Sequence, residues 1–204
     1  MRVGILGGTF DPIHIGHLII AEEARQQLKL DTVLLIPTGQ PWLKEGRPIS
    51  DARHRLAMVD LAIKGNPAFA SSAMEIERAG PTYTIDTLRA LRAKDPAAEL
   101  LFIVGADSLA DFHRWKEPEA VLGLCTVVAF GRPGYNEASL RSFEQHMGPA
   151  ARAKIKVLTG PEIGVSGTGI RRRVALGLRV RYLVPEPVRD YIAKHKLYRG
   201  EAGR

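Results

Sequence analysis

Short apolar runs alternate with helical patterns along most of the chain, and this alternation constrains the fold more than any other feature. Five runs are continuously apolar, as strands buried on both faces of a parallel sheet are: residues 3–6, 32–36, 100–104, 126–130 and 155–158. Three segments between them carry apolar residues at helical spacing: Ile20/Ala24/Leu28, Leu56/Val59/Ile63 and Ile85/Leu88/Leu91. This order predicts an α/β fold, a doubly wound and mostly parallel sheet with right-handed crossovers.

The 204 residues are expected to form a single domain, residues 1–204, because no linker, internal repeat or low-complexity tract divides them. The lone Cys125 excludes a disulfide framework and a cysteine-based zinc site, and it suits a reducing compartment. No apolar run approaches the ~18 residues of a membrane span. Met1 leads into a strand rather than into a signal peptide. We therefore expect a cytoplasmic protein with no membrane partner.

The positive charge is concentrated near the C-terminus. From Ala151 onward the chain has 13 Lys and Arg against 4 Asp and Glu, whereas the first 150 residues have 16 against 18. This balance suits an anionic partner such as a polyphosphate or a nucleic acid. A solvated helix face is the alternative, and it is the commoner reason for such charge runs.

The segment after the first expected strand has the features of a phosphate site. Gly7 and Gly8 let the backbone turn sharply and approach a ligand closely. A helix is expected to begin near Ile15–Gly16, where its amide groups and dipole favour an anion. His14 and His17 are three residues apart, so both can lie on one side of the helix start. A tight turn followed by two capping histidines is the alternative.

Other phosphate and metal motifs are missing from the sequence. There is no G-x-G-x-x-G dinucleotide fingerprint and no Gly-Lys-Ser/Thr of a Walker A loop. Two histidines without a third ligand make a poor zinc site, so we expect no protein-bound metal. In doubly wound sheets, ligands bind at the carboxyl ends of the strands near the topological switch point. The glycine- and histidine-containing segment is expected at that edge.

Two separated signatures identify a superfamily that the chain resembles. Residues 8–17, Gly-Thr-Phe-Asp-Pro-Ile-His-Ile-Gly-His, resemble the nucleotidylyltransferase signature G-x-F-x-P-x-H-x-G-H. Residues 166–171, Ser-Gly-Thr-Gly-Ile-Arg, resemble the second signature of that superfamily, S-x-T-x-x-R. The two occur in the usual order, about 150 residues apart, with a strand–helix pattern between them.

The stretches between the signatures resemble one branch of this superfamily, the bacterial nicotinate-mononucleotide adenylyltransferases. The similar segments are Gly-Pro-Thr-Tyr-Thr-Ile-Asp-Thr-Leu at 80–88, Phe-Ile-Val-Gly-Ala-Asp at 102–107 followed by Trp115, Arg-Pro-Gly-Tyr at 132–135, and the closing segment 182–198. The resemblance implies a Rossmann-like nucleotidylyltransferase fold with a small C-terminal helical segment. It also implies synthesis of nicotinate adenine dinucleotide (deamido-NAD) from ATP and nicotinate mononucleotide in NAD biosynthesis.

The resemblance implies roles for individual residues as well. Catalysis is assigned to His14, His17 and Arg171. Binding of ATP is assigned to the two signatures and to the end of one strand: Gly7, Gly8, Thr9, Phe10, His14, Gly16, His17, Gly105, Asp107, Ser166, Thr168, Ile170 and Arg171. Binding of nicotinate mononucleotide is assigned to Lys44, Tyr83, Thr84, Trp115 and Arg132. Mg²⁺ is expected to arrive on the ATP phosphates, since it keeps several waters and seldom needs an all-protein cage.

Some of these residues have simpler interpretations. Trp115 offers a flat face for a nicotinate ring, but a tryptophan is more often part of the core. Tyr83 and Thr84 open a helix whose amides could meet the nicotinate carboxylate, and an N-cap is the alternative. Asp107 could accept hydrogen bonds from ribose hydroxyls or cap the next turn.

Two departures from the family pattern are visible. Residues 41–44 are Pro-Trp-Leu-Lys where the family often has Pro-Pro-His-Lys, which leaves open the group that meets the substrate phosphate there. Residues 166–168 are Ser-Gly-Thr rather than Ser-Ser-Thr, which removes one hydroxyl and is expected to make the loop more flexible.

The expected reaction is a direct in-line attack of the mononucleotide phosphate on ATP, aided by positioning and charge neutralisation. Sister transferases that act on phosphopantetheine or nicotinamide mononucleotide, or that use CTP, are the nearest alternatives. Class I aminoacyl-tRNA synthetases share the His-Ile-Gly-His of residues 14–17, but their Lys-Met-Ser-Lys-Ser is absent here. A non-enzymatic nucleic-acid-binding module is the remaining alternative. We expect no nucleic-acid partner, and no pattern specifies an oligomeric state.

Overall fold

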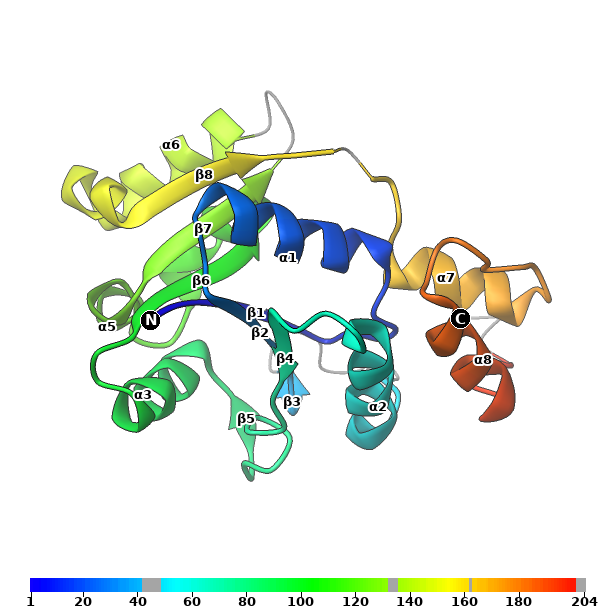
Figure 1. Ribbon diagram of the computed structural model, residues 1–204. Helices are drawn as coiled ribbons and strands as arrows, with labels where there is room; N and C mark the ends of the chain where they lie inside the picture. The colour runs from blue at the N-terminus through cyan, green and yellow to red at the C-terminus, as the bar shows by residue number, and fades with distance from the viewer. Residues whose placement is uncertain (42–48, 132–135, 162, 201–204) are drawn as a thin grey trace.

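The computed structural model describes residues 1–41, 49–131, 136–161 and 163–200 of the chain. Within these residues the main sheet has six strands, all paired in parallel, in the order β4-β2-β1-β6-β7-β8 (Figure 1). They are β1 (Arg2–Gly8), β2 (Thr32–Pro37), β4 (Phe69–Ser71), β6 (Glu99–Gly105), β7 (Thr126–Gly131) and β8 (Ile155–Thr159). Two further short strands, β3 (Gln40–Pro41) and β5 (Pro81–Thr82), form a second parallel pair.

The strand order contains one change of direction. The chain enters the sheet at β1, adds β2 and β4 on one side, and then crosses over to add β6, β7 and β8 on the other side. The switch point therefore lies between the neighbouring strands β1 and β6, which end at Gly8 and Gly105. Ligands of doubly wound sheets bind at this place.

Helices cover both faces of the main sheet. They are α1 (Ile15–Gln27), α2 (Ala52–Ile63), α3 (Thr84–Lys94), α4 (Asp107–Ala110), α5 (Pro118–Leu124), α6 (Asn136–Met147), α7 (Gly167–Ala175) and α8 (Glu186–Lys194), with 3₁₀ segments at Phe112–Arg114 and Pro149–Lys154. The helices α1, α2, α7 and α8 contribute to one buried apolar cluster, and α3 to α6 contribute to another. Successive strand residues alternate between the two clusters, as they do for Ile5 and Leu6 of β1.

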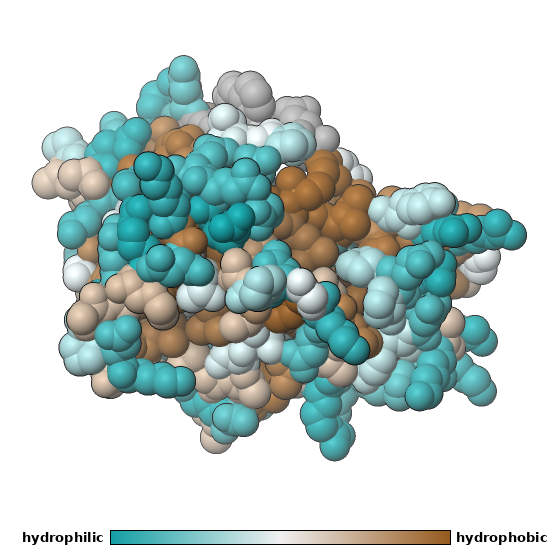
Figure 2. Space-filling view, viewed as in Figure 1, coloured by the Kyte–Doolittle hydropathy of each residue, from teal (hydrophilic) through white to brown (hydrophobic). Residues whose placement is uncertain are grey.

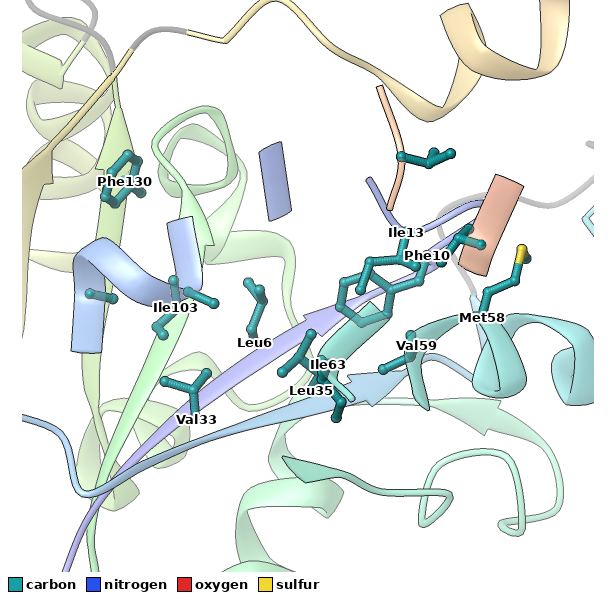
Figure 3. Packing of buried hydrophobic residues seen from close by; sticks show 14 of the residues in the cluster. Leu6, Phe10, Ile13, Val33, Leu35, Met58, Val59, Ile63, Ile103 and Phe130 are labelled. Atoms are coloured by element: carbon teal, nitrogen blue, oxygen red, sulfur yellow. The ribbon is translucent and has the colours of Figure 1, made fainter. Parts of the chain in front are cut away.

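The first cluster also includes the loop that follows β1. Phe10 and Ile13 of this loop point into the same core as Met58 and Val59 of α2 (Figure 3). Both loop side chains are almost completely buried, with 2% and 0% of their surface exposed. Their burial stabilises this loop in one conformation, because each side chain gains on the order of 2 kcal/mol from leaving water.

The sequence-based expectations for the fold are largely confirmed. Each of the five expected strands is present, lengthened by one or two residues at its ends, and the three expected helices are α1, α2 and α3. The strand β4 was not predicted, because its three residues lie partly exposed at the sheet edge and carry no apolar run. The short strands β3 and β5 were missed for the same lack of pattern.

The expected C-terminal helical segment is formed by α7 and α8, which lie beyond the end of the sheet (Figure 1). Val188 and Ile192 of α8 pack into the same cluster as Met58 of α2. Residues 171–200 contain nine Lys and Arg against two Asp and Glu, and hydrophilic side chains dominate this end of the molecule in Figure 2. Among the helices of the described residues, none has the length and apolar character that crossing a membrane requires.

Candidate active site

The loop after β1 places two histidines face to face at the start of α1. His14 is the N-cap residue, with φ −145° and ψ 171°, and its backbone N–H donates to Nδ1 of His17 over 3.2 Å. The two imidazole rings stack with their centroids 3.7 Å apart and their planes 23° apart. The expectation that both histidines lie on one side of the helix start is confirmed.

Phe10 packs against the His17 ring of this pair. Its ring meets the His17 ring edge-on, with the centroids 5.0 Å apart, and its backbone has a positive φ of 49°. A Cβ on Gly8 would lie 3.3 Å from the Phe10 ring, closer than ordinary contact. Gly8 therefore lets the buried phenyl ring come close to the backbone at the end of β1.

His14 is held in an environment that disfavours its charged form. The residue is 7% exposed, and Nδ1 has no hydrogen-bond partner in the described part of the chain. Burial lowers the pKa of His14 from 6.5 to about 4. The imidazole is therefore neutral at pH 7.

Asp11 ties three distant parts of the chain to the signature loop. Its Oδ1 accepts a hydrogen bond from the Tyr198 hydroxyl over 2.7 Å, and its Oδ2 accepts one from the Ser50 backbone N–H over 3.2 Å. Its backbone carbonyl accepts a third from Nη1 of Arg171 over 2.7 Å. Burial and the nearby Asp11 charge raise the pKa of Tyr198 far above its usual range. Through this network, Arg171 of the second signature contacts the loop that contains the first signature.

Arg55 holds the same loop from α2. It is 2% exposed and donates to the backbone carbonyls of Thr9, Ser50 and Gly39, over 2.8, 3.0 and 3.3 Å. Burial lowers the pKa of its guanidinium, while the Asp11 charge opposes that shift. One buried cation thus joins the loop after β1, the loop after β2 and the approach to α2.

Sequence reasoning assigned no role to Asp11, Arg55 or Tyr198. A signal for Arg55 does exist, because it stands four residues before Val59 on the apolar face of α2. A charged residue at such a position has to find buried partners.

The second signature forms the start of α7. Ser166 is its N-cap, and the Ser166 hydroxyl accepts a hydrogen bond from the Gly169 N–H over 3.1 Å. Nη2 of Arg171 donates to the Thr168 hydroxyl over 3.3 Å, and Ile170 is buried in the core. A Cβ on Gly167 would lie 2.9 Å from the Asp11 carbonyl oxygen. The glycine that departs from the family pattern therefore has a packing reason at this contact.

Two small cavities meet at His14. The first, of about 160 Å³, is mostly polar and is lined by both signatures: Thr9, Phe10, Asp11, Pro12, His14, His17, Ile49, Gly167, Thr168 and Arg171. The second, of about 170 Å³, is mostly apolar and lies against α1 and the ends of β7 and β8: His14, Gly16, Ile19, Ile20, Phe130, Gly131, Gly160, Pro161, Ile163 and Val165.

Several other predicted site residues do not line these cavities in the described part of the chain. Gly105 and Asp107 are exposed at the end of β6 and the start of α4, and they line neither cavity. Lys44 and Arg132 lie outside the described residues. Gly7 lies within β1, paired with Ile36 of β2.

Tyr83, Thr84 and Trp115 make up a second group. Tyr83 is the N-cap of α3, and Thr84 is its first residue. Trp115 is half-buried, with its ring against Phe112 at 4.8 Å and Phe102 at 5.9 Å between centroids. The tryptophan is thus partly core, as the simpler interpretation held, and partly available to a ligand.

The described residues contain no group of three or more His, Cys, Asp or Glu side chains that could hold a metal ion. The polar cavity instead offers imidazole, guanidinium and hydroxyl groups, which bind phosphate.

Comparison with known proteins places the chain in a class and then in a family. Residues 5–173 match the cytidylyltransferase-like family, so the fold and both signatures are those of a nucleotidyltransferase. A protein of Thermomicrobium roseum named "Probable nicotinate-nucleotide adenylyltransferase" is 48% identical over 97% of this chain and 92% of its own length. One of the same name from Symbiobacterium thermophilum is 45% identical over 98% and 97%. The chain belongs to the nicotinate-nucleotide adenylyltransferase family.

Solved structures agree on the Rossmann-like fold. The nicotinic acid mononucleotide adenylyltransferase of Plasmodium falciparum, complexed with NaAD, has a TM-score of 0.76 at 19% identity and covers 97% of both chains. A putative nicotinate-nucleotide adenylyltransferase from Vibrio parahaemolyticus has a TM-score of 0.69 at 20% identity, covering 98% of this chain and 96% of its own.

Proposed function

We propose that this protein joins ATP and nicotinate mononucleotide to give nicotinate adenine dinucleotide and pyrophosphate. The observation that carries the proposal is that residues from both signatures line one polar cavity at the start of α1. An apolar cavity shares His14 with it, so the pair offers one compartment for phosphates and one for a base. Family membership supports the choice of both substrates.

The chemistry is a single in-line displacement at the α-phosphorus of ATP. An oxygen of the mononucleotide phosphate forms the new P–O bond, and the bond to the β-phosphate oxygen breaks as pyrophosphate leaves. The attacking phosphate is already anionic at neutral pH and requires no general base. Catalysis therefore depends on holding two anions together and on neutralising charge that develops on the leaving group.

The polar cavity supplies donors for this task. His14 and His17 donate to the transferring and departing phosphates, and Arg171 binds the β- and γ-phosphates beside Thr168. Because a neighbouring anion favours the charged imidazole, polyphosphate binding raises the pKa of His14 from its value of about 4.

The remaining roles are assigned by the family pattern. Gly105 and Asp107 bind the ribose. The adenine ring is assigned instead from the lining of the apolar cavity beside α1, which suits a flat base. The nicotinate ring stacks on Trp115, its carboxylate meets the Tyr83 and Thr84 amides, and Lys44 and Arg132 hold the mononucleotide phosphate. ATP enters with Mg²⁺ on its phosphates as part of the substrate. We place the enzyme in the cytoplasm.

The test is pyrophosphate release from Mg-ATP with nicotinate mononucleotide, its amide analogue or phosphopantetheine, measured side by side. We expect the highest kcat/KM with nicotinate mononucleotide. Preference for phosphopantetheine, or the absence of pyrophosphate release with all three acceptors, would refute the proposal.

A further inference from the structure

Residues 115–117 are attached along α3 by two neighbouring ion pairs. Nζ of Lys116 lies 3.3 Å from Oδ2 of Asp86 in the first turn of the helix. The Glu117 carboxylate receives both terminal nitrogens of Arg89, over 2.6 and 3.0 Å. Asp86 and Arg89 are three residues apart, so the two pairs meet successive turns of one helix face. Trp115, next in the chain, is thereby kept near the amino end of α3.

Lys116 also faces the residue that begins the helix. Its Nζ lies 4.5 Å from the centroid of the Tyr83 ring, and Tyr83 is the N-cap of α3. The ammonium group therefore lies beside the side chains of the N-cap residue Tyr83 and of Asp86 in the first turn, on the helix end at which the nicotinate carboxylate is proposed to bind. About two-fifths of the Lys116 side chain is exposed, so an incoming ligand can approach it.

Two carboxyl groups lie near the first turn of α3 and oppose an anionic ligand there. Asp86 belongs to that turn. Glu75 comes from the segment before β5, is 6% exposed and accepts a hydrogen bond from the Thr87 hydroxyl of α3 over 2.7 Å. Burial raises the pKa of Glu75 to about 7, so this carboxyl carries a reduced charge at neutral pH. Asp86 is more exposed, and its charge is balanced by Lys116. A ring carboxylate would be repelled by an unbalanced Asp86, whereas a neutral carboxamide would not.

We propose that Lys116 is a specificity-determining residue, which neutralises Asp86 at the amino end of α3 and so favours a mononucleotide with a ring carboxylate over its carboxamide. The inference rests on the proposed function, in which this ring lies between Trp115 and α3. The ion pair between Arg89 and Glu117 already attaches the segment to the helix, with two short hydrogen bonds. The segment therefore stays attached without Lys116, whose partly exposed ion pair with Asp86 contributes little to folding stability.

The test compares kcat/KM for nicotinate mononucleotide and for its amide in three variants. Lys116→Gln should lower the acid-to-amide ratio about tenfold, through a higher KM for the acid, because one unit charge a few ångströms away acts through an intermediate dielectric. The KM for ATP should stay as in the wild type. Lys94→Gln removes an equal charge from the exposed far end of the same helix, and it should change the ratio less than about twofold.

The double variant Asp86→Asn/Lys116→Gln separates charge balance from attachment. Since it removes both charges, the acid-to-amide ratio should return to within about threefold of the wild type. A double variant no better than Lys116→Gln, or a Lys116→Gln enzyme with the wild-type ratio, would overturn the inference while leaving the proposed function intact. A wild-type enzyme that releases no pyrophosphate with the acid would overturn both.

Discussion

Replacing Arg55 with methionine should destabilise the protein more than any exposed arginine change. Arg55 is buried and donates to three backbone carbonyls, those of Thr9, Ser50 and Gly39. Methionine fills a similar volume, but it leaves those carbonyl oxygens without their donors and removes one of the cations near Asp11. The loop that positions His14 and His17 then loses its support from α2.

The magnitude follows from the contacts. Hydrogen bonds from a charged donor contribute roughly 1.5–3 kcal/mol each, and the 3.3 Å contact with Gly39 is the weakest of the three. Part of this loss is offset, because the variant no longer has to bury a charged guanidinium. Breaking a buried charged network from one side typically costs about 3–5 kcal/mol, and we expect a decrease of this size in the free energy of unfolding.

Urea unfolding at pH 7 measures the effect, by linear extrapolation of the free energy of unfolding. Arg53→Met is the matched control, because Arg53 lies on the same helix with 89% of its side chain exposed and pairs with Asp51. That variant should keep a free energy of unfolding close to that of the wild type, because an exposed ion pair contributes little. Arg55→Lys keeps the charge without the guanidinium fork and should fall between the two. Equal losses for Arg55→Met and Arg53→Met would refute the assigned role.

Four further predictions concern the active site. His17→Ala should lower kcat about 100-fold while the thermal midpoint stays near that of the wild type, and a kcat within a few-fold would remove its role. Tyr198→Phe removes the hydroxyl that donates to Asp11, so it should lower the free energy of unfolding by about 1–2 kcal/mol. It should also raise the KM for ATP, and an unchanged KM would show that this hydrogen bond does not support ATP binding. The pKa of His14 is about 4 in the folded protein, below its ordinary value of 6.5, so the unfolded chain binds a proton at this residue more tightly than the folded protein does. Protonation of the unfolded chain should therefore lower the free energy of unfolding as the pH falls from 6.5 toward 4, by ~3 kcal/mol in total. The His14→Asn variant should lack that part of the pH dependence in urea unfolding, and an identical dependence would contradict it. Trp115→Ala should raise the KM for nicotinate mononucleotide more than the KM for ATP; equal rises would indicate a purely structural tryptophan.

The sequence was sufficient for the parts of the fold that have a repeating pattern. Strands buried on both faces leave continuous apolar runs, and β1, β2, β6, β7 and β8 were predicted for this reason. The strand β4 is too short to leave such a run. The His14–His17 pair was also predictable, because its geometry is local to one helix start.

The supporting network was not predictable from the sequence. Tyr198 and Asp11 are 187 residues apart, and their contact exists only once α8 has packed against α2. The acceptors of Arg55 are backbone carbonyls, which every residue possesses and which leave no mark in the sequence. The roles of Asp11, Arg55 and Tyr198 follow only from their contacts in the folded protein.

The uneven charge of the molecule has a kinetic consequence. The helix α7 begins at the polar cavity and continues into the segment 171–200, which contains nine basic and two acidic residues. Such a field draws a diffusing triphosphate toward the cavity mouth and speeds its encounter at low ionic strength. The same attraction delays the escape of pyrophosphate, so added salt slows capture of one polyanion while it hastens departure of the other.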